Sequence, residues 1–335
     1  MREIFKNGKK YKLPDSLSPF QEKLYIHLID WKRTNVSAEH GYDNNHIPYD
    51  AILPENVRNE LPQIYPPIRE IVREMEFKHH NYFHHMASSQ AANINLFLPI
   101  LLNENVNDIM RMIKKDFKKL ACSFYNKGFC LEYWGKSSSN KGILGDHTAR
   151  SGTDADIAIA YYNTKDELCL WLIEHKLAEN DFTKCGAFRS KARDPKKHDC
   201  TRTFVEIIAN KNLCYYSDVR KNRYWEITDA FQWYFKNHHT FTSCPFKDGM
   251  NQLWRNQLMG FALEQDGEFK HVYFSVVKHP DNTSLDAIIK KYERLTDLNE
   301  KFSVLTTSQI VETASLVKSA KISDWAEWFK TLYDV

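Results

Sequence analysis

The chain lacks the long apolar run that a membrane-spanning helix needs, since no stretch of about 18 apolar residues occurs. Its basic N-terminal segment, MREIFKNGKKYKLPDSL, also lacks the apolar core of a signal peptide. A Ser nucleophile elbow, a Walker A loop and a dinucleotide-binding fingerprint are absent as well. We therefore expect a cytoplasmic protein without a membrane segment, outside the enzyme classes that those motifs mark.

The chain also lacks a strong excess of charge, because its formal net charge is only +3 over 335 residues. Basic residues nevertheless gather locally, and such clusters suit the neutralisation of nucleic-acid phosphates. A solvated loop and a solvated helix face are the simpler explanation of the same pattern. The clusters are a segment at 184–197, with Lys184, Arg189, Lys191, Arg193, Lys196 and Lys197, and a helix expected at 104–120, with Arg111, Lys114, Lys115, Lys118 and Lys119.

Apolar residues at helical spacing predict a helical N-terminal part. A Pro- and Asn-rich connector at 36–67 interrupts it. The helices are expected at 16–32, 68–78, 87–102 (ending near Pro99) and 104–120.

The pattern then changes to short segments rich in β-branched and aromatic residues, which predict strands at 128–134, 155–162, 168–176 and 269–278. Further helices are expected at 248–265, 283–297, 308–318 and 323–332, the last with a capping box of Asp324 and Glu327. This order predicts an α/β fold in which helices frame a mixed sheet. We divide the chain into an N-terminal helical extension (1–86), a core (87–278) with a Cys-rich basic insertion (177–247), and a C-terminal helical extension (279–335).

The most informative stretch is SGTDADIAIAYYNTKDELCLWLIEHKL, where Asp156 opens one expected strand and Glu174 and Lys176 close the next. Side chains two residues apart on a strand face the same way, so Glu174 and Lys176 project together and His175 projects to the other face. If the two strands pair as a hairpin, Asp156 lies beside Glu174 and Lys176. Two carboxylates hold Mg²⁺ or Mn²⁺, and a lysine can stabilise charge or position a nucleophilic water.

A Glu-x-Lys pair at a strand end is often only a surface salt bridge. Two features favour a catalytic role: the strand before Glu174 is almost wholly apolar, and an aspartate opens the preceding strand. Asp154 competes with Asp156 for this role. We prefer Asp156 because the apolar strand residues begin directly after it.

These motifs resemble the PD-(D/E)XK, or restriction-endonuclease-like, nucleases, and in particular a bacterial branch of them. The resemblance covers roughly residues 79–278 and rests on SSQAANINLF at 88–97, LEYW at 131–134, GDHTA at 145–149, and CPFKDGMNQLWRNQL at 244–258. It implies an αβββαβ core with a central mixed sheet. The chain departs from the family pattern by a central His175 and by extra residues between Asp146 and Asp156, which leaves the choice between Asp154 and Asp156 open.

The resemblance implies further site residues. Glu132 would lie near the metal with Asp156 and Glu174, and Gln252 would join the catalytic group. Gln252, Arg255 and Asn256 share one helical face, which would look toward the active site or toward solvent, and Arg255 would contact nucleic acid. Gln90 and Asn95 are expected to be structural polar groups of a buried helix, or alternatively to reach the site.

Two sets of residues resemble metal sites more weakly. Cys185, Cys200, Cys214 and Cys244 lie in the insertion and could bind an iron–sulfur cluster or zinc, but their spacing lacks a Cys-x-x-Cys pair, and cysteine is often simply buried. The seven cysteines of the chain, an odd number, are expected to be reduced thiols or metal ligands rather than disulfides. The histidines His79, His80, His84 and His85 are expected to contact a partner or to be structural, with zinc ligation the less favoured alternative.

Together these observations predict a Mg²⁺- or Mn²⁺-dependent nuclease that hydrolyses phosphodiester bonds, with DNA as the expected substrate and a homodimer as one candidate assembly. The competing hypothesis is a non-catalytic nucleic-acid-binding or scaffold protein on the same fold. A metal-binding regulatory module built on the cysteines is a weaker third.

Overall fold

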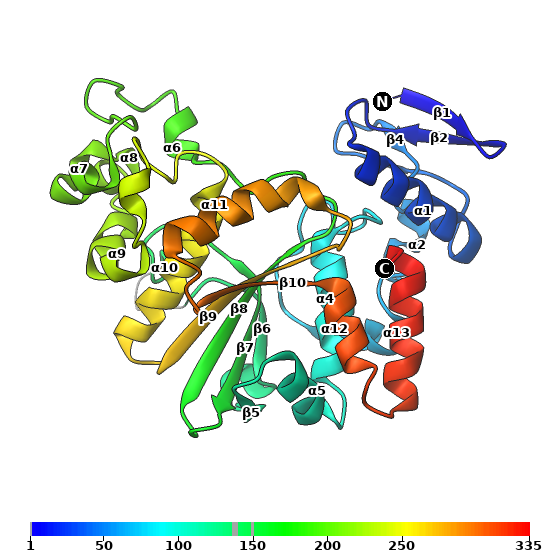
Figure 1. Ribbon diagram of the computed structural model, residues 1–335. Coiled ribbons are helices and arrows are strands. Elements are labelled where there is room, and N and C mark those ends of the chain that lie inside the picture. Colours follow the sequence, from blue (N-terminus) through cyan, green and yellow to red (C-terminus); the bar gives the residue numbers. More distant parts are fainter. Residues whose placement is uncertain (1, 136–139, 149–150) are drawn as a thin grey trace.

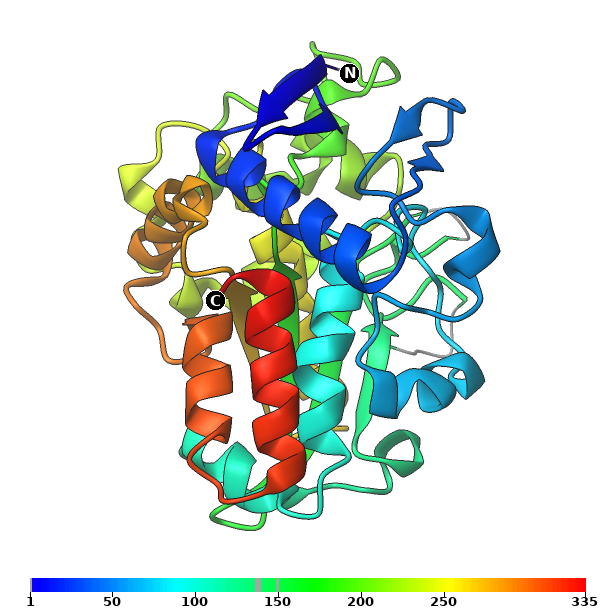
Figure 2. The ribbon, with the colours of Figure 1, turned by 90° about the vertical axis from the view of Figure 1, so that its right-hand side faces the viewer.

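A mixed six-stranded sheet forms the centre of the described part of the chain. The computed structural model describes residues 2–135, 140–148 and 151–335 and is shown from two sides in Figures 1 and 2. The strand order is β10-β9-β8-β7-β5, and β6 pairs with β7 beside β5. The strands are β5 (Phe117–Leu120), β6 (Phe129–Tyr133), β7 (Ala155–Asn163), β8 (Leu168–Lys176), β9 (His271–Lys278) and β10 (Phe302–Thr306).

The central hairpin of β7 and β8 is antiparallel, and Ile157 lies opposite Ile173 in its register. Both strands are buried on both faces, which explains why β8 is apolar almost throughout instead of alternating with polar residues. One set of side chains, which includes Ile157 and Ile173, belongs to one hydrophobic core cluster. The alternate set, which includes Ala158 and Leu172, belongs to the other.

Parallel pairing extends the sheet on the other side of β8, first to β9 and then to β10. Parallel neighbours need crossover connections, and the helices α10 (Met250–Asp266) and α11 (Asp286–Thr296) provide them. These two helices cover one face of the sheet (Figure 1). The opposite face is covered by α4 (Ser89–Leu101), α12 (Thr307–Ala314) and α13 (Ala320–Tyr333), which stand side by side in Figure 2.

The remaining elements surround this core. The N-terminal part contains a hairpin of β1 (Arg2–Lys6) and β2 (Lys9–Leu13), helix α1 (Pro19–Asn35), the short strands β3 (Gly41–Tyr42) and β4 (Pro48–Tyr49), and helices α2 (Glu55–Arg58) and α3 (Arg69–Glu74). Helix α5 (Val106–Ile113) precedes β5, and the insertion at 177–247 holds α6 (Gly186–Arg189), α7 (Phe204–Ala209), α8 (Tyr215–Asp218) and α9 (Tyr224–Ala230). None of the helices in the described residues combines the length and apolar composition needed to cross a membrane.

The expected mixed sheet framed by helices is confirmed, but several local predictions are wrong. The helix predicted at 104–120 ends at Ile113, and residues 117–120 form β5. The N-terminal hairpin and the strand β10 were not foreseen, although β10 completes the sheet. The last helix begins at Ala320 with Ser319 at its N-cap, so the capping box of Asp324 and Glu327 is wrong.

Helix α4 also continues past Pro99, where its end was expected, and reaches Leu101. Proline has no N–H, so it leaves the carbonyl of the residue four positions earlier without its helical donor. In this fold the indole N–H of Trp325 on α13 donates to that carbonyl, of Asn95, at 2.7 Å. The tertiary contact thus replaces the missing hydrogen bond and lets the helix continue.

Candidate active site

Asp156 and Glu174 face one another across the central hairpin. The β7–β8 register ends with Ile157 opposite Ile173, so Asp156 and Glu174 are the next residues of the two strands, and both project to the face that Ala158 and Leu172 share. Lys176 follows two residues later on that face, while His175 projects to the other. Asp156 is further fixed because its Oδ2 accepts a hydrogen bond from the backbone N–H of His175 at 2.6 Å. The hairpin expected from the sequence therefore brings the three charged residues together.

Glu174 is only 3% exposed, and both its carboxylate oxygens are bound by protein donors. Lys176 Nζ lies 2.8 Å from Oε1, and Gln252 Nε2 donates to the same atom at 2.6 Å. Asn256 Nδ2 donates to Oε2 at 2.8 Å. Gln252 and Asn256 lie one turn apart on α10, so this helix presents a polar face to the carboxylate rather than to solvent.

Glu132 on β6 is a third carboxylate near Asp156, and its backbone is strained. Its φ of 51° lies in the left-handed region, which is uncommon for a residue other than glycine. The register of β6 against β7 pairs the residues on either side of Glu132 but omits Glu132 itself. Gln90 Nε2 on α4 donates to Glu132 Oε1 at 2.7 Å, and His80 Nε2 lies 3.0 Å from Oε2. Side chains from the N-terminal part of the chain thus hold this carboxylate in place.

The carboxylates crowd negative charge into a buried space. Burial raises the pKa of Asp156 well above its usual range, and the negative charges of Glu174 and Glu132 raise it further. The hydrogen bond that His80 donates to Glu132 raises the pKa of His80. For Lys176, burial opposes the charged form, but the carboxylates of Glu174, Glu179 and Asp156 raise its pKa above the usual value. Cations are therefore stabilised here, and isolated anions are not.

This donor set fits a divalent cation, because carboxylate oxygens are the ligands that Mg²⁺ and Mn²⁺ prefer. Within residues 2–135, 140–148 and 151–335, no three His, Cys, Asp or Glu side chains are arranged to hold a metal ion as they stand. In this structure amide, imidazole, ammonium and backbone donors bind oxygens of these carboxylates. A cation would replace some of these donors.

A family model described as restriction endonuclease associating with ARP (REase-ARP) matches residues 26–334. The chain belongs to this family. No curated protein and no solved structure matches the chain significantly. Membership confirms the resemblance to restriction-endonuclease-like proteins and supports a nuclease-like function.

Asp154, the alternative aspartate of this REase-ARP protein, lies just before β7 and outside the hairpin. Its Oδ1 lies 3.3 Å from His147 Nε2, and its side chain is 34% exposed. Burial raises its pKa, which the nearby charge of His147 opposes. Asp154 therefore lies near the carboxylate group but before β7, whereas Asp156 lies within the strand and is bound by the backbone N–H of His175.

Arg255 does not share the contacts of Gln252 and Asn256. Its guanidinium Nη1 donates to Gly152 O at 3.3 Å and to Thr153 Oγ1 at 3.2 Å, and lies 3.8 Å from Asp146 Oδ2. The hydroxyl of Tyr224 donates to the same Asp146 oxygen at 2.6 Å. In this arrangement Arg255 ties the Gly145-Asp146 segment to α10. Ala149, the last residue of GDHTA, lies outside the described residues. A contact of Arg255 with nucleic acid stays a prediction.

The segment that carries the basic residues of the insertion begins beside the active site. Thr183 N donates to Gln252 Oε1 at 3.0 Å, and Gln252 in turn binds Glu174, so the insertion is attached to the site through one shared amide. Lys184, Arg189, Lys191, Lys196 and Lys197 are exposed, while Arg193 is half-buried and contacts Cys200 Sγ at 3.5 Å. Their contact with DNA stays a prediction.

The second basic cluster lies at the opposite end of the sheet. Phe117 of β5 pairs with Asn163, seven residues along β7 from Asp156, which is about 23 Å at the usual rise of a strand. Lys118 there pairs with Asp166 at 2.7 Å, and Lys114 pairs with Asp116 at 2.7 Å. The position of β5 therefore separates this cluster from the carboxylates.

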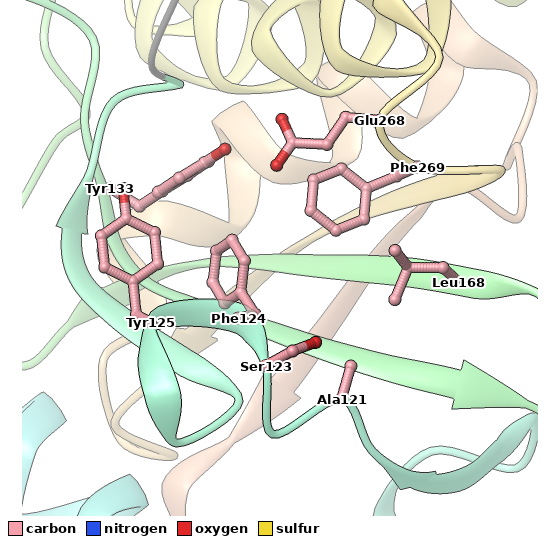
Figure 3. Close-up of a pocket in the computed structure, with 8 residues that line it drawn as sticks. All are labelled: Ala121, Ser123, Phe124, Tyr125, Tyr133, Leu168, Glu268 and Phe269. Atoms are coloured by element: carbon pink, nitrogen blue, oxygen red, sulfur yellow. The ribbon is translucent and has the colours of Figure 1, made fainter.

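A cavity of about 350 Å³ also lies at this far end (Figure 3). Leu168, the first residue of β8, lines it with Phe124, Tyr133 and Phe269, and the carboxylate of Glu268 lies beside these rings. Leu168 is six residues along β8 from Glu174, but Tyr133 directly follows Glu132 on β6, so the cavity extends along β6 from the far end toward the candidate active site.

The histidine group divides in the structure. His80 reaches Glu132, whereas His85 is buried and packs against the rings of Tyr25 and Tyr49. The sequence pattern treated these histidines alike, so the contact of His80 with a site carboxylate was missed. Asn93 was also missed: its side chain donates to the backbone oxygen of Asp156 at 3.2 Å. It belongs to the same SSQAANINLF segment as Gln90, and that shared segment was the available signal.

Asn95 of the same segment is structural. Its side-chain oxygen accepts from Tyr65 N at 2.8 Å, and its amide donates to Gln63 O and to the hydroxyl of Tyr333, both at 2.8 Å. Gln90, by contrast, takes the alternative that the sequence left open and reaches the site at Glu132.

Proposed function

We propose that this REase-ARP protein is a Mg²⁺- or Mn²⁺-dependent deoxyribonuclease. The observation that carries the proposal is the placement of Asp156 beside the strand end that holds Glu174, which is only 3% exposed, with Lys176 2.8 Å from Glu174 on the same sheet face. Its membership in a restriction endonuclease family supports the same function.

Asp156 and Glu174 would hold the cation, and Glu132 would support them from β6. When bound, the cation would polarise the scissile phosphate and lower the pKa of a coordinated water. Lys176 would stabilise the negative charge that develops on the phosphate or orient the attacking water. Gln252 and Asn256 would orient Glu174, since each donates to one of its two oxygens.

DNA would approach from the side of the insertion. The exposed Lys184, Lys191 and Lys196 lie on the segment that Thr183 links to Gln252. Contacts of lysine with phosphates position a duplex without reading its sequence. We therefore assign this surface to backbone binding and leave base recognition to other groups.

The test compares the wild-type protein with Glu174→Gln on linear, circular and single-stranded DNA, each with Mg²⁺, with Mn²⁺ and with a chelator. Glutamine keeps the size of the side chain but removes the negative charge that binds the cation. We expect metal-dependent cleavage by the wild type and a loss of at least about 100-fold in Glu174→Gln, equal to about 2.7 kcal/mol of transition-state stabilisation.

Glu167→Gln is the matched control, because Glu167 precedes β8 at the far end of the hairpin and contacts Asn163 and His271. It should cleave DNA like the wild type. Equal cleavage by the wild type and Glu174→Gln would overturn the assignment. Binding of DNA by both, with cleavage by neither, would instead support the non-catalytic binding protein.

A further inference from the structure

An aromatic cavity lies where the 3₁₀ turn η2 (Phe124–Asn126), strand β6 and the segment between α10 and β9 meet. Its volume is about 350 Å³, near the lower end for pockets that hold small molecules. Four of the eight residues that line it carry aromatic rings, and one, Glu268, carries a charge. None of the eight is a lysine or an arginine, so the lining holds no cation of its own. The four rings belong to Phe124, Tyr125, Tyr133 and Phe269 (Figure 3).

These rings stand at steep angles to one another. The ring of Phe124 lies 4.8 Å from that of Tyr125 at an angle of 74°, and 5.9 Å from that of Phe269 at 76°. Tyr133 meets Phe124 at 63° and Tyr125 at 89°, with centroids 5.6 and 6.3 Å apart. Phe269 and Tyr133 are almost fully buried, whereas Tyr125 is 42% exposed and forms the rim. Rings in edge-to-face contact do not stack flat on one another, so they enclose a space and line it.

Tyr125 takes part in the lining at a cost in backbone energy. Its φ of 47° and ψ of 33° lie in the left-handed region, which is unfavourable for a bulky residue. Consecutive side chains of a regular helix diverge by about 100°, which would point Tyr125 away from the side that Phe124 occupies. The left-handed conformation breaks this geometry, and both rings line the same cavity. Strained residues of this kind cluster at ligand-binding sites.

Glu268 places a negative charge beside the rings. In Figure 3 its carboxylate points toward the space between Tyr133 and Phe269. Within the described part of the chain this carboxylate has no hydrogen bond and no ion pair, and partial burial together with the charge of Asp266 raises its pKa. Burial raises the pKa of Tyr133 and of Tyr125, and the charge of Glu268 adds to both effects. The faces of aromatic rings are also negative, so the cavity as a whole is electronegative.

We propose that this cavity binds a methylated ammonium group, such as the trimethylammonium end of choline or of a methylated lysine side chain. A cation against the faces of Phe and Tyr rings is attracted by their quadrupoles. The methyl groups are apolar and suit the aromatic walls, whereas a primary ammonium would lose hydrogen bonds to water that the rings do not replace. Glu268 at the rim supplies the opposite charge. This role is independent of whether the protein cleaves DNA.

A nucleobase is the competing ligand, because bases also stack on aromatic rings. A base from a nucleic acid would bring the anionic phosphates of its backbone beside Glu268 and Asp266. Binding of such a backbone requires basic side chains that neutralise it, and the residues that line the cavity include none. The charges of the cavity therefore favour the organic cation over the base.

The experiment titrates the full chain, in sodium phosphate buffer, in a calorimeter. The probes are choline, capped trimethyllysine, deoxycytidine, and the neutral tert-butyl analogue of choline, in which carbon replaces nitrogen. Both cations should bind, and the neutral analogue, which has the same shape, should bind at least about 5-fold more weakly than choline. The tighter of the two cations distinguishes a small molecule from a modified side chain as the natural source. The proposal is overturned if neither cation binds, if the neutral analogue binds as tightly as choline, or if deoxycytidine binds more tightly.

Two variants test the lining with little disturbance of the fold, because both positions are exposed. Glu268→Gln keeps the size of the side chain and removes its charge, and Tyr125→Ala removes the ring at the rim. Each should weaken choline binding by about 3- to 5-fold at an unchanged melting temperature. Asp266→Asn is the matched control, since it removes a neighbouring charge that does not line the cavity, and its affinity should stay within about twofold of the wild type. Wild-type affinity for choline in both Glu268→Gln and Tyr125→Ala would place the ligand elsewhere and overturn the assignment.

Discussion

Gln90 on α4 donates a 2.7 Å hydrogen bond to Glu132 on β6, and the same amide donates to Lys78 O at 2.9 Å. One side chain thereby joins the segment before α4 to a carboxylate of the candidate site. Because Glu132 has a φ of 51°, its orientation depends on contacts that compensate for an unfavourable backbone conformation. Gln90 and His80 supply those contacts, so α4 and the segment before it complete the site.

Replacing Gln90 with alanine should therefore reduce the affinity of the site for the cation more than it reduces the stability of the fold. We expect the Mg²⁺ concentration for half-maximal cleavage to rise by about 10-fold, as is common when a group that orients a metal ligand is removed. Cleavage rates across a Mg²⁺ titration measure this effect. Gln265→Ala, at an exposed position on α10, is the control and should match the wild type. An unchanged Mg²⁺ dependence in a folded Gln90→Ala protein would exclude this role.

The two aspartates can be separated by substituting each with asparagine. Asp156→Asn should reduce cleavage by about 100-fold or more, because the Asp156 carboxylate lies beside Glu174 and would bind the cation directly. Asp154→Asn should retain activity within about 10-fold, since Asp154 lies before the strand and contacts His147. Initial rates on linear DNA decide between them. A larger loss in Asp154→Asn would transfer the role to that residue.

The hairpin of the candidate site was predictable because its signals are local. The apolar run of β8 and the alternation of side chains place Glu174 and Lys176 on one face without any knowledge of distant contacts. The polar face of α10 was also visible, since Gln252 and Asn256 are one helical turn apart. Arg255 shares that face in the sequence, but a tertiary contact with Asp146 gives it a different environment.

The strand β5 could not be predicted from spacing alone. Phe117 and Leu120 are three residues apart and both buried, which is typical of a helix. In the structure, the register against β7 shifts between Phe117 and Lys119, which lets both apolar side chains face inward from a strand. Phe117 then stacks on Tyr161 of β7, with ring centroids 5.2 Å apart. A pairing partner on the distant strand β7 decides this element, and local sequence does not contain that information.

The placement of the two basic clusters leads to a prediction about DNA affinity. Replacing Lys184, Lys191 and Lys196 together with alanine should weaken DNA binding and make it less dependent on salt, because fewer counterions are released on binding. The slope of log Kd against log salt should fall by roughly 2 to 3, since three lysines no longer neutralise phosphates. Fluorescence anisotropy with a labelled duplex in Ca²⁺, over a range of salt concentrations, measures this slope.

The control is the triple replacement of Lys115, Lys118 and Lys119, which removes the same number of positive charges from the far end of the sheet. It should leave the slope close to that of the wild type. Equal reductions in both triple variants would show that net charge, rather than the position of the insertion, determines the affinity.

His85 should make the stability of the protein sensitive to acid. It is buried among Tyr25 and Tyr49, and its Nδ1 accepts a hydrogen bond from Ala87 N at 3.0 Å, which requires the neutral ring. Burial lowers the pKa of His85 from 6.5 to about 4. Between these values the unfolded chain binds a proton that the folded chain does not, so the free energy of unfolding falls as the pH falls from 6.5 toward 4.

His85→Asn keeps an acceptor for Ala87 but cannot be protonated. From about pH 7 to about pH 4, urea unfolding should show that the wild type loses roughly 2–3 kcal/mol more stability than His85→Asn. The same pH dependence in both proteins would mean that His85 is accommodated as a cation in the folded state.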